Sequence, residues 1–276
     1  MPSYPTVPLV RILFCVALVG LAAGTPPPVA PVSVATLAVP SPIPAASRQM
    51  LLVTTDSWDA TTGRLQRYRR SRSRWLAVGG PVATVVGRSG LGWGRGLHTA
   101  QEARSGDPTK REGDGRAPAG AFRLTAAFGY GASERTGLPY LPTGSDTECV
   151  DDAASPAYNT VRERTPGDVW TSHEEMRRGD GLYRIGVVVA HNGPGVDSAL
   201  VAGSGASTVP SGGSCIFLHV WNGPASTTSG CTAMPDASLQ TILAWLDADA
   251  EPVLVQLPRA ERSRLARAWG LPAERG

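Results

Sequence analysis

A short apolar run, CIFLHV, spans residues 215–220 and contains no Asp, Glu, Lys or Arg. A continuous apolar run of this length is typical of a strand that is buried on both faces. Residues 184–190, with the sequence RIGVVVA, follow the same pattern. These two stretches predict a mostly β fold whose central strands are covered on both sides.

Further segments on either side have strand or helix patterns. We expect strands over 50–55, 65–70, 75–78, 82–86, 121–124 and 253–257. Ser172 and Glu175 have the spacing of a capping box, which predicts a short helix that ends at Gly179. A second helix is expected after Asp236, because its apolar residues fall at helical spacing: Leu239, Ile242, Leu243 and Leu246. A third is expected over 258–269, before Gly270.

Composition and charge exclude several classes of protein. Hydrophobic residues make up 42% of the 276 residues, which excludes a disordered chain. The net charge of +3 does not suit a protein that coats nucleic acid. Six arginines lie within residues 64–74, but only Tyr68 and Trp75 are near them to stack on bases. We therefore expect a solvated basic face and no nucleic-acid partner.

The first 47 residues have the composition of an export signal and a linker. Arg11 precedes an uncharged, mostly apolar run over 12–23 that is too short for a spanning helix, and small residues follow. We predict a signal peptide over 1–24, a Pro-rich tether over 25–47, and a folded domain over 48–276. An uncleaved anchor is the alternative. The protein is then exported, and is periplasmic or associated with the cell wall of a bacterium, where cysteines are oxidised.

The cysteine count indicates a reactive thiol. Without Cys15 of the signal, three cysteines remain: Cys149, Cys215 and Cys231. An odd number in an exported chain predicts one disulfide and one free thiol. Cys231 follows Ser229 and Gly230, and His219 ends the apolar run, so a Cys/His pair is the favoured interpretation.

Two other interpretations of the same residues remain open. A metal site could use Cys215, His219 and Cys231, although the close cysteine pairs that zinc sites favour are missing. The protein could also be a wall-binding module without catalytic activity, and the loss of Cys231 would then leave its function unchanged.

Three ordered blocks resemble the L,D-transpeptidase (YkuD-type) catalytic domain. They are GSCIFLH at 213–219 with SGCTAM at 229–234, KREGDGR at 110–116, and CVDD at 149–152. The resemblance covers residues 50–257 and implies a β-sandwich or barrel with an active-site cleft. It implies that Cys231 is the nucleophile, that His219 is the base, and that backbone N–H groups around Gly230 and Cys231 form the oxyanion hole. No metal or organic cofactor is implied.

The resemblance also implies the substrate and the reaction. The thiolate attacks a carbonyl of a peptidoglycan stem peptide, and an amine or water resolves the thioester. A carbapenem is the corresponding covalent inhibitor. In the commoner pattern a histidine precedes the Gly-Cys pair, whereas this chain has Ser229, and the spacing from His219 to Cys231 is shorter. A Ser-Gly-Cys branch includes hydrolases, so an L,D-carboxypeptidase or related peptide hydrolase is the alternative to a transpeptidase.

Four polar residues in or beside these blocks are candidates for substrate binding: Ser214, Asn192, His191 and Asn159. The alternative for each is a structural hydrogen bond. Because Cys231 must stay unpaired to act as a nucleophile, we expect Cys149 and Cys215 to form the disulfide.

Overall fold

The computed structural model describes residues 1, 41–196 and 208–273. The expected signal peptide, apart from Met1, and the tether up to residue 40 lie outside these residues. None of the helices in the described part of the chain has the length and apolar character needed to cross a membrane.

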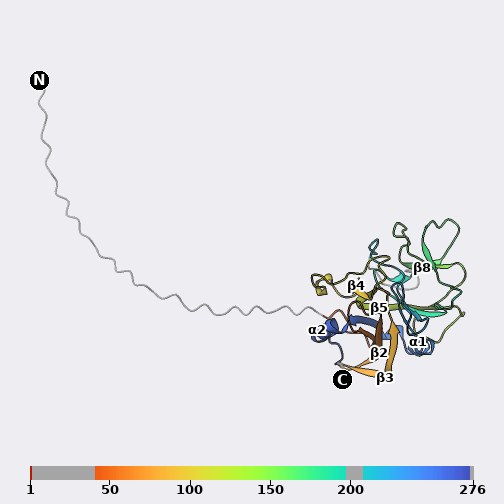
Figure 1. The fold of residues 1–276 in the computed structure, drawn as a ribbon, viewed down its shortest axis with the longest axis horizontal. Coiled ribbons are helices and arrows are strands. Elements are labelled where there is room, and N and C mark those ends of the chain that lie inside the picture. Colours follow the sequence, from red (N-terminus) through yellow and green to blue (C-terminus); the bar gives the residue numbers. More distant parts are fainter. Residues whose placement is uncertain (2–40, 197–207, 274–276) are drawn as a thin grey trace. The chain divides into compact units, whose positions relative to one another are not determined.

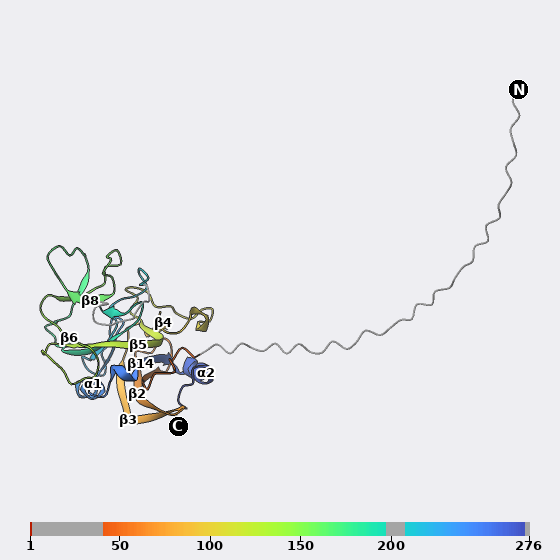
Figure 2. The ribbon, with the colours of Figure 1, turned by 180° about the vertical axis from the view of Figure 1, so that it is seen from behind.

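The described strands form a mostly β domain whose main sheet closes on itself (Figures 1 and 2). Around the closed sheet the order is β10, β12, β13, β3, β2, β1, β14 and β5, and β5 pairs again with β10. The bounds are β1 (Gln49–Thr55), β2 (Thr62–Ser71), β3 (Arg74–Val85), β5 (Ala117–Gly129), β10 (Ile185–Val189), β12 (Phe217–Val220), β13 (Thr232–Met234) and β14 (Val253–Pro258). Two short strands, β4 (Leu91–Trp93) and β6 (Tyr140–Pro142), each pair in parallel with β5. The mostly β, barrel-like fold expected from the sequence is confirmed.

A separate small sheet lies beside the barrel. Its order is β11 (Gly195–Val196), β8 (Thr160–Glu163), β7 (Thr147–Val150) and β9 (His173–Glu175). In the register of β7 and β9, Cys149 lies opposite Glu174. A disulfide from Cys149 to Cys215 joins this sheet to the segment just before β12.

Two helices each cover part of the barrel. Helix α1 (Asp236–Leu243) buries Leu239, Ile242 and Leu243 in one core cluster. Helix α2 (Arg259–Trp269) buries Leu265 and Trp269 in another, which also contains residues of β1 and β14. The φ of Gly270 is +63°, a left-handed conformation that glycine adopts without strain, and α2 ends there as expected.

Several expected elements differ from the structure. The two strands expected at 75–78 and 82–86 form one strand, β3. The whole segment pairs with β2, with one irregularity in the register. The helix expected over 172–179 is wrong: residues 173–175 are strand β9, paired with β7. Helix α1 is present, but Pro235 occupies its N-cap and Asp236 is its first residue.

The end of the expected tether packs on the domain. Ile43 is buried in the core cluster that contains α2, and the hydroxyl of Ser41 donates to the carbonyl of Trp269 at 2.9 Å. Arg70 donates to the carbonyl of Ala45 at 2.7 Å and lies 4.4 Å from the Trp75 ring centroid. Residues 41–45 of the expected tether therefore contact the folded domain. Of the six clustered arginines, those at 64, 69, 72 and 74 are exposed, as expected for a solvated face.

Candidate active site

A cavity of about 400 Å³ is lined by residues from several elements of the barrel and the small sheet. Cys231 lies just before β13, and His219 lies on β12, its parallel neighbour. The cavity is also lined by Ser214, Tyr183, Glu174 and Asp151. Cys231 and His219, which are 12 positions apart in the chain, therefore line one cavity together.

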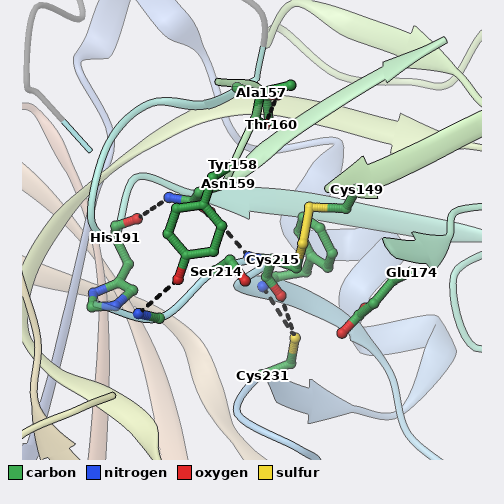
Figure 3. Close-up of a disulfide and its surroundings, with 12 residues drawn as sticks. Cys149, Ala157, Tyr158, Asn159, Thr160, Glu174, His191, Ser214, Cys215 and Cys231 are labelled. Carbon is green, nitrogen blue, oxygen red and sulfur yellow. Dashed lines mark hydrogen bonds between the residues drawn. A yellow bond between two sulfur atoms is a disulfide. The ribbon is translucent and has the colours of Figure 1, made fainter. Parts of the chain in front are cut away.

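The Cys231 thiol is held between two backbone groups, as Figure 3 shows. The N–H of Phe217 donates to Sγ at 3.3 Å, and the thiol donates to the carbonyl of Cys215 at 3.3 Å. Only 6% of the residue is exposed. Burial, reinforced by the negative charge of Glu174, raises the pKa of Cys231 to about 12. The resting group is therefore a protonated thiol.

The orientation of His219 is set by its own strand. Its Nδ1 lies 2.8 Å from the carbonyl of Val220. A carbonyl only accepts, so Nδ1 carries the hydrogen and Nε2 of the neutral ring is the acceptor. Burial lowers the pKa of His219 to about 4. The Tyr183 ring packs edge-on against the imidazole, with centroids 5.1 Å apart.

This geometry suits a nucleophile and a base that are both neutral at rest. A neutral imidazole can take the thiol proton as the sulfur attacks a carbonyl, and can return it to a leaving amine. A model of the L,D-transpeptidase catalytic domain (YkuD) matches residues 58–255. The chain belongs to the L,D-transpeptidase family. No curated protein and no solved structure gives a significant match.

The two N–H groups expected to form an oxyanion hole in this L,D-transpeptidase domain differ in their hydrogen bonds. The N–H of Gly230 donates to the hydroxyl of Thr228 at 3.2 Å, and this hydroxyl donates to the carbonyl of Cys231 at 2.6 Å. The N–H of Cys231 has no hydrogen-bond partner among the described residues. Of the two N–H groups expected to form an oxyanion hole, that of Cys231 is therefore free to do so. Ser229 lines the cavity.

Glu112 connects the block at 110–116 to the segment before β12. Its Oε2 accepts hydrogen bonds from the hydroxyls of Ser214, at 2.7 Å, and Tyr158. The Tyr158 oxygen in turn accepts the N–H of Gly213 at 3.2 Å. Ser214 lies at the cavity, but its hydroxyl is used in this network.

The other three candidates for substrate binding are not among the described residues that line the cavity. Asn159 donates to the carbonyls of His191 and Asn192 at 2.8 and 2.9 Å and accepts the N–H of Cys215 at 3.0 Å. Asn192 donates to the carbonyls of Val209 and Gly213. His191 accepts the N–H of Arg95 and donates to the carbonyl of Gly212. These side chains hold the loop at 191–192 and the segment at 209–215 in place by hydrogen bonds to the backbone.

The expected disulfide joins Cys149 and Cys215, and Cys231 is the free cysteine of the described residues. Cys215 has a φ of +54°, a conformation that few non-glycine residues adopt. The disulfide and Asn159 both hold Cys215 in this conformation, which points its carbonyl at the Cys231 thiol. The disulfide uses the Cys215 sulfur, so the alternative metal site of Cys215, His219 and Cys231 is wrong.

Two groups that line the cavity and interact with the thiol or its base, Tyr183 and Glu174, are not among the residues expected from the sequence. Tyr183 is 5% exposed, and its hydroxyl donates to Oε2 of Glu174 at 2.7 Å. Glu174 falls within the helix expected over 172–179, whereas it lies on β9. The expected disulfide was one signal that could have located Glu174. It brings the Cys149 strand, and with it any strand paired to that strand, close to the active site.

Proposed function

We propose that this protein is a cysteine acyltransferase that acts on peptidoglycan stem peptides through a thioester on Cys231. The observation that carries the proposal is the cavity that Cys231 and His219 line together, and the N–H of Cys231 has no hydrogen-bond partner among the described residues. Membership of the L,D-transpeptidase family supports the substrate class.

In the proposed reaction, Sγ attacks the carbonyl of the third stem residue while Nε2 of His219 takes the thiol proton. The oxyanion forms against the N–H of Cys231. When the tetrahedral intermediate collapses, the bond to the terminal residue breaks and His219 protonates the departing amine. An acceptor amine then displaces the thiolate from the thioester.

We propose a cellular compartment on the basis of the same residues. A disulfide persists in an oxidising compartment. The reactive thiol of Cys231 must also avoid thiol–disulfide exchange with this disulfide. We propose that the protein is exported and works at the cell wall. The Cys149–Cys215 disulfide and the apolar run near the N-terminus support this placement.

Incubation with a purified disaccharide-peptide, followed by mass spectrometry, tests the proposal. We expect cross-linked dimers from the wild type and none from Cys231→Ala. Trimmed peptides without dimers would assign the hydrolase alternative, which Ser229 in place of the commoner histidine favours. Turnover by Cys231→Ala would contradict the mechanism.

A carbapenem offers an independent measurement on the same thiol. Its ring carbonyl should acylate Cys231 and give a single adduct by intact-mass analysis, absent from Cys231→Ala. An adduct on any other residue would relocate the nucleophile.

A further inference from the structure

Two carboxylates line the cavity together with the nucleophile. Glu174 on β9 and Asp151, which follows β7, are both lining residues. Figure 3 shows the Glu174 carboxylate directed towards the Cys231 sulfur. The Tyr183 hydroxyl donates to Oε2 of Glu174 at 2.7 Å and so fixes the direction of this carboxylate.

Neither carboxylate is paired directly with a cation of the described chain, although the charge of Arg178 acts on Glu174. Among the described residues, neither Glu174 nor Asp151 forms an ion pair, and Oδ1 of Asp151 is buried without a hydrogen-bond partner. The cations of the cavity are engaged elsewhere. Lys110 pairs with Asp114 at 2.7 Å and Arg178 pairs with Asp180, while Arg88 donates to the carbonyl of Gly113.

A buried carboxylate oxygen without a partner is costly, and a cationic ligand would remove that cost. The two carboxylates are also electrostatically coupled, since Asp151 contributes to raising the pKa of Glu174 after the larger effect of burial. A group that carries both positive charge and N–H donors satisfies both residues at once. An alkylammonium group has these properties.

The position of Glu174 is rigidly tied to the nucleophile. Glu174 lies opposite Cys149 in the β7–β9 register, Cys149 is bonded to Cys215, and the carbonyl of Cys215 accepts the Cys231 thiol. A group bound at Glu174 is therefore held beside the sulfur and the acyl group on it.

We propose, on the basis of the thioester chemistry above, that Glu174 and Asp151 bind the ammonium group of the acyl acceptor and that Glu174 accepts its proton. They are thus specificity-determining residues that favour transfer to an amine over hydrolysis.

The proton balance of this step closes with the groups in the cavity. The carboxylate of Glu174 takes one proton from the ammonium ion and leaves a neutral amine. The amine nitrogen attacks the thioester carbonyl, the new C–N bond forms and the C–S bond breaks. His219 takes the second proton from nitrogen and passes it to the departing sulfur. Glu174 then releases its proton to water.

The test compares two nucleophiles on the same acyl-enzyme. The donor is the disaccharide-peptide, and the acceptors are Nα-acetyllysine, which is cationic at pH 7.5, and hydroxylamine, which is uncharged. We measure the rate of Cys231 acylation and the partition of the thioester among the products. The variant is Glu174→Gln. The matched control is Glu175→Gln, its exposed neighbour on β9, which does not line the cavity.

Loss of a charged hydrogen bond to the ammonium group should lower transfer to Nα-acetyllysine about tenfold or more. The ratio of transfer to Nα-acetyllysine over transfer to hydroxylamine should therefore fall, whatever change in acylation follows from removing the Glu174 charge beside Cys231, and Glu175→Gln should behave as wild type. Asp151→Asn should weaken the acceptor in the same direction. Glu174→Asp should recover part of the loss, which a merely misfolded variant would not do.

Three results would overturn the inference. Equal losses with both nucleophiles would show that Glu174 only supports the fold of the site. Slower acylation with an unchanged partition would place the carboxylate on the donor side. A wild-type thioester that only hydrolyses in the presence of Nα-acetyllysine would exclude an acceptor site. If the wild type forms no thioester at all, the proposed function itself fails, and the inference with it.

Discussion

The proton of the Cys231 thiol is the central question at the scale of single residues. Because burial raises the pKa of Cys231 to about 12 and lowers that of His219 to about 4, an ion pair between them is disfavoured at rest. The thiol must therefore lose its proton during attack, when the developing charge moves to the oxyanion. A resting thiol of this kind also resists oxidation, since the thiolate is the reactive form.

This proton coupling predicts two different pH profiles for acylation by a carbapenem. In the wild type, His219 is the neutral base throughout pH 6 to 9, so the rate should be nearly constant. In His219→Ala the thiolate must form in solution equilibrium, and its fraction grows about tenfold per pH unit below the thiol pKa. Stopped-flow or mass-resolved rates measure both. A His219→Ala profile as flat as the wild type would remove His219 from the role of base.

At the scale of elements, the sequence predicts correctly those strands and helices that have a signal within their own residues. The apolar runs of β10 and β12 and the Gly270 that ends α2 are local signals, and each is confirmed. Strand β9 has only three residues, and its strand conformation comes from pairing with β7. The capping-box spacing of Ser172 and Glu175 favours a helix, but pairing with β7 determines the conformation. A rule based on neighbouring residues does not detect such long-range pairing.

The candidate site divides in the same way. Cys231 and His219 could be found because both lie in one compact block of motif. Glu174 and Tyr183 reach the thiol only through strand register, a disulfide and ring packing. Asn159 and Asn192, the candidates for substrate binding, do not line the cavity and bond to loop carbonyls. Their bonds to loop carbonyls depend on backbone positions that the sequence does not reveal.

The disulfide between β7 and the segment before β12 should stabilise the fold and the site together. Cross-linking a loop of this length, with a sequence separation of 66, contributes roughly 4 kcal/mol in the chain-entropy model. We expect Cys149→Ser/Cys215→Ser to lose stability of about that size by urea unfolding. It should also acylate more slowly, because the Cys215 carbonyl is no longer held at the thiol. Unchanged acylation in the double variant would separate the disulfide from the site.

For the whole molecule, buried neutral histidines make stability depend on pH. Burial lowers the pKa of His219 to about 4 and that of His191 to about 3. The unfolded chain, with histidine pKa values near ~6.5, binds more protons than the folded protein between these limits. Stability therefore rises with pH through this window and falls as the solution is acidified below about pH 6.5.

Acid sensitivity gives a quantitative test on the intact domain. Between pH 7 and pH 5 each of these histidines should cost about 2 kcal/mol of unfolding free energy. His219→Gln should lose less stability than the wild type over the same interval, by about the contribution of one histidine. Urea unfolding at the two pH values measures the difference. Equal losses in the two proteins would mean that His219 titrates alike in the folded and unfolded states.

Strand β1 pairs in parallel with β14, so that Met50 lies beside Val253 at opposite ends of the folded chain. During synthesis the barrel cannot close until this last strand has left the ribosome, and β1 has no partner on that side until then. Such long-range pairing raises contact order and slows folding. The export proposed above would pass the chain through a narrow translocation channel, and a barrel that closes late keeps the chain open for that passage.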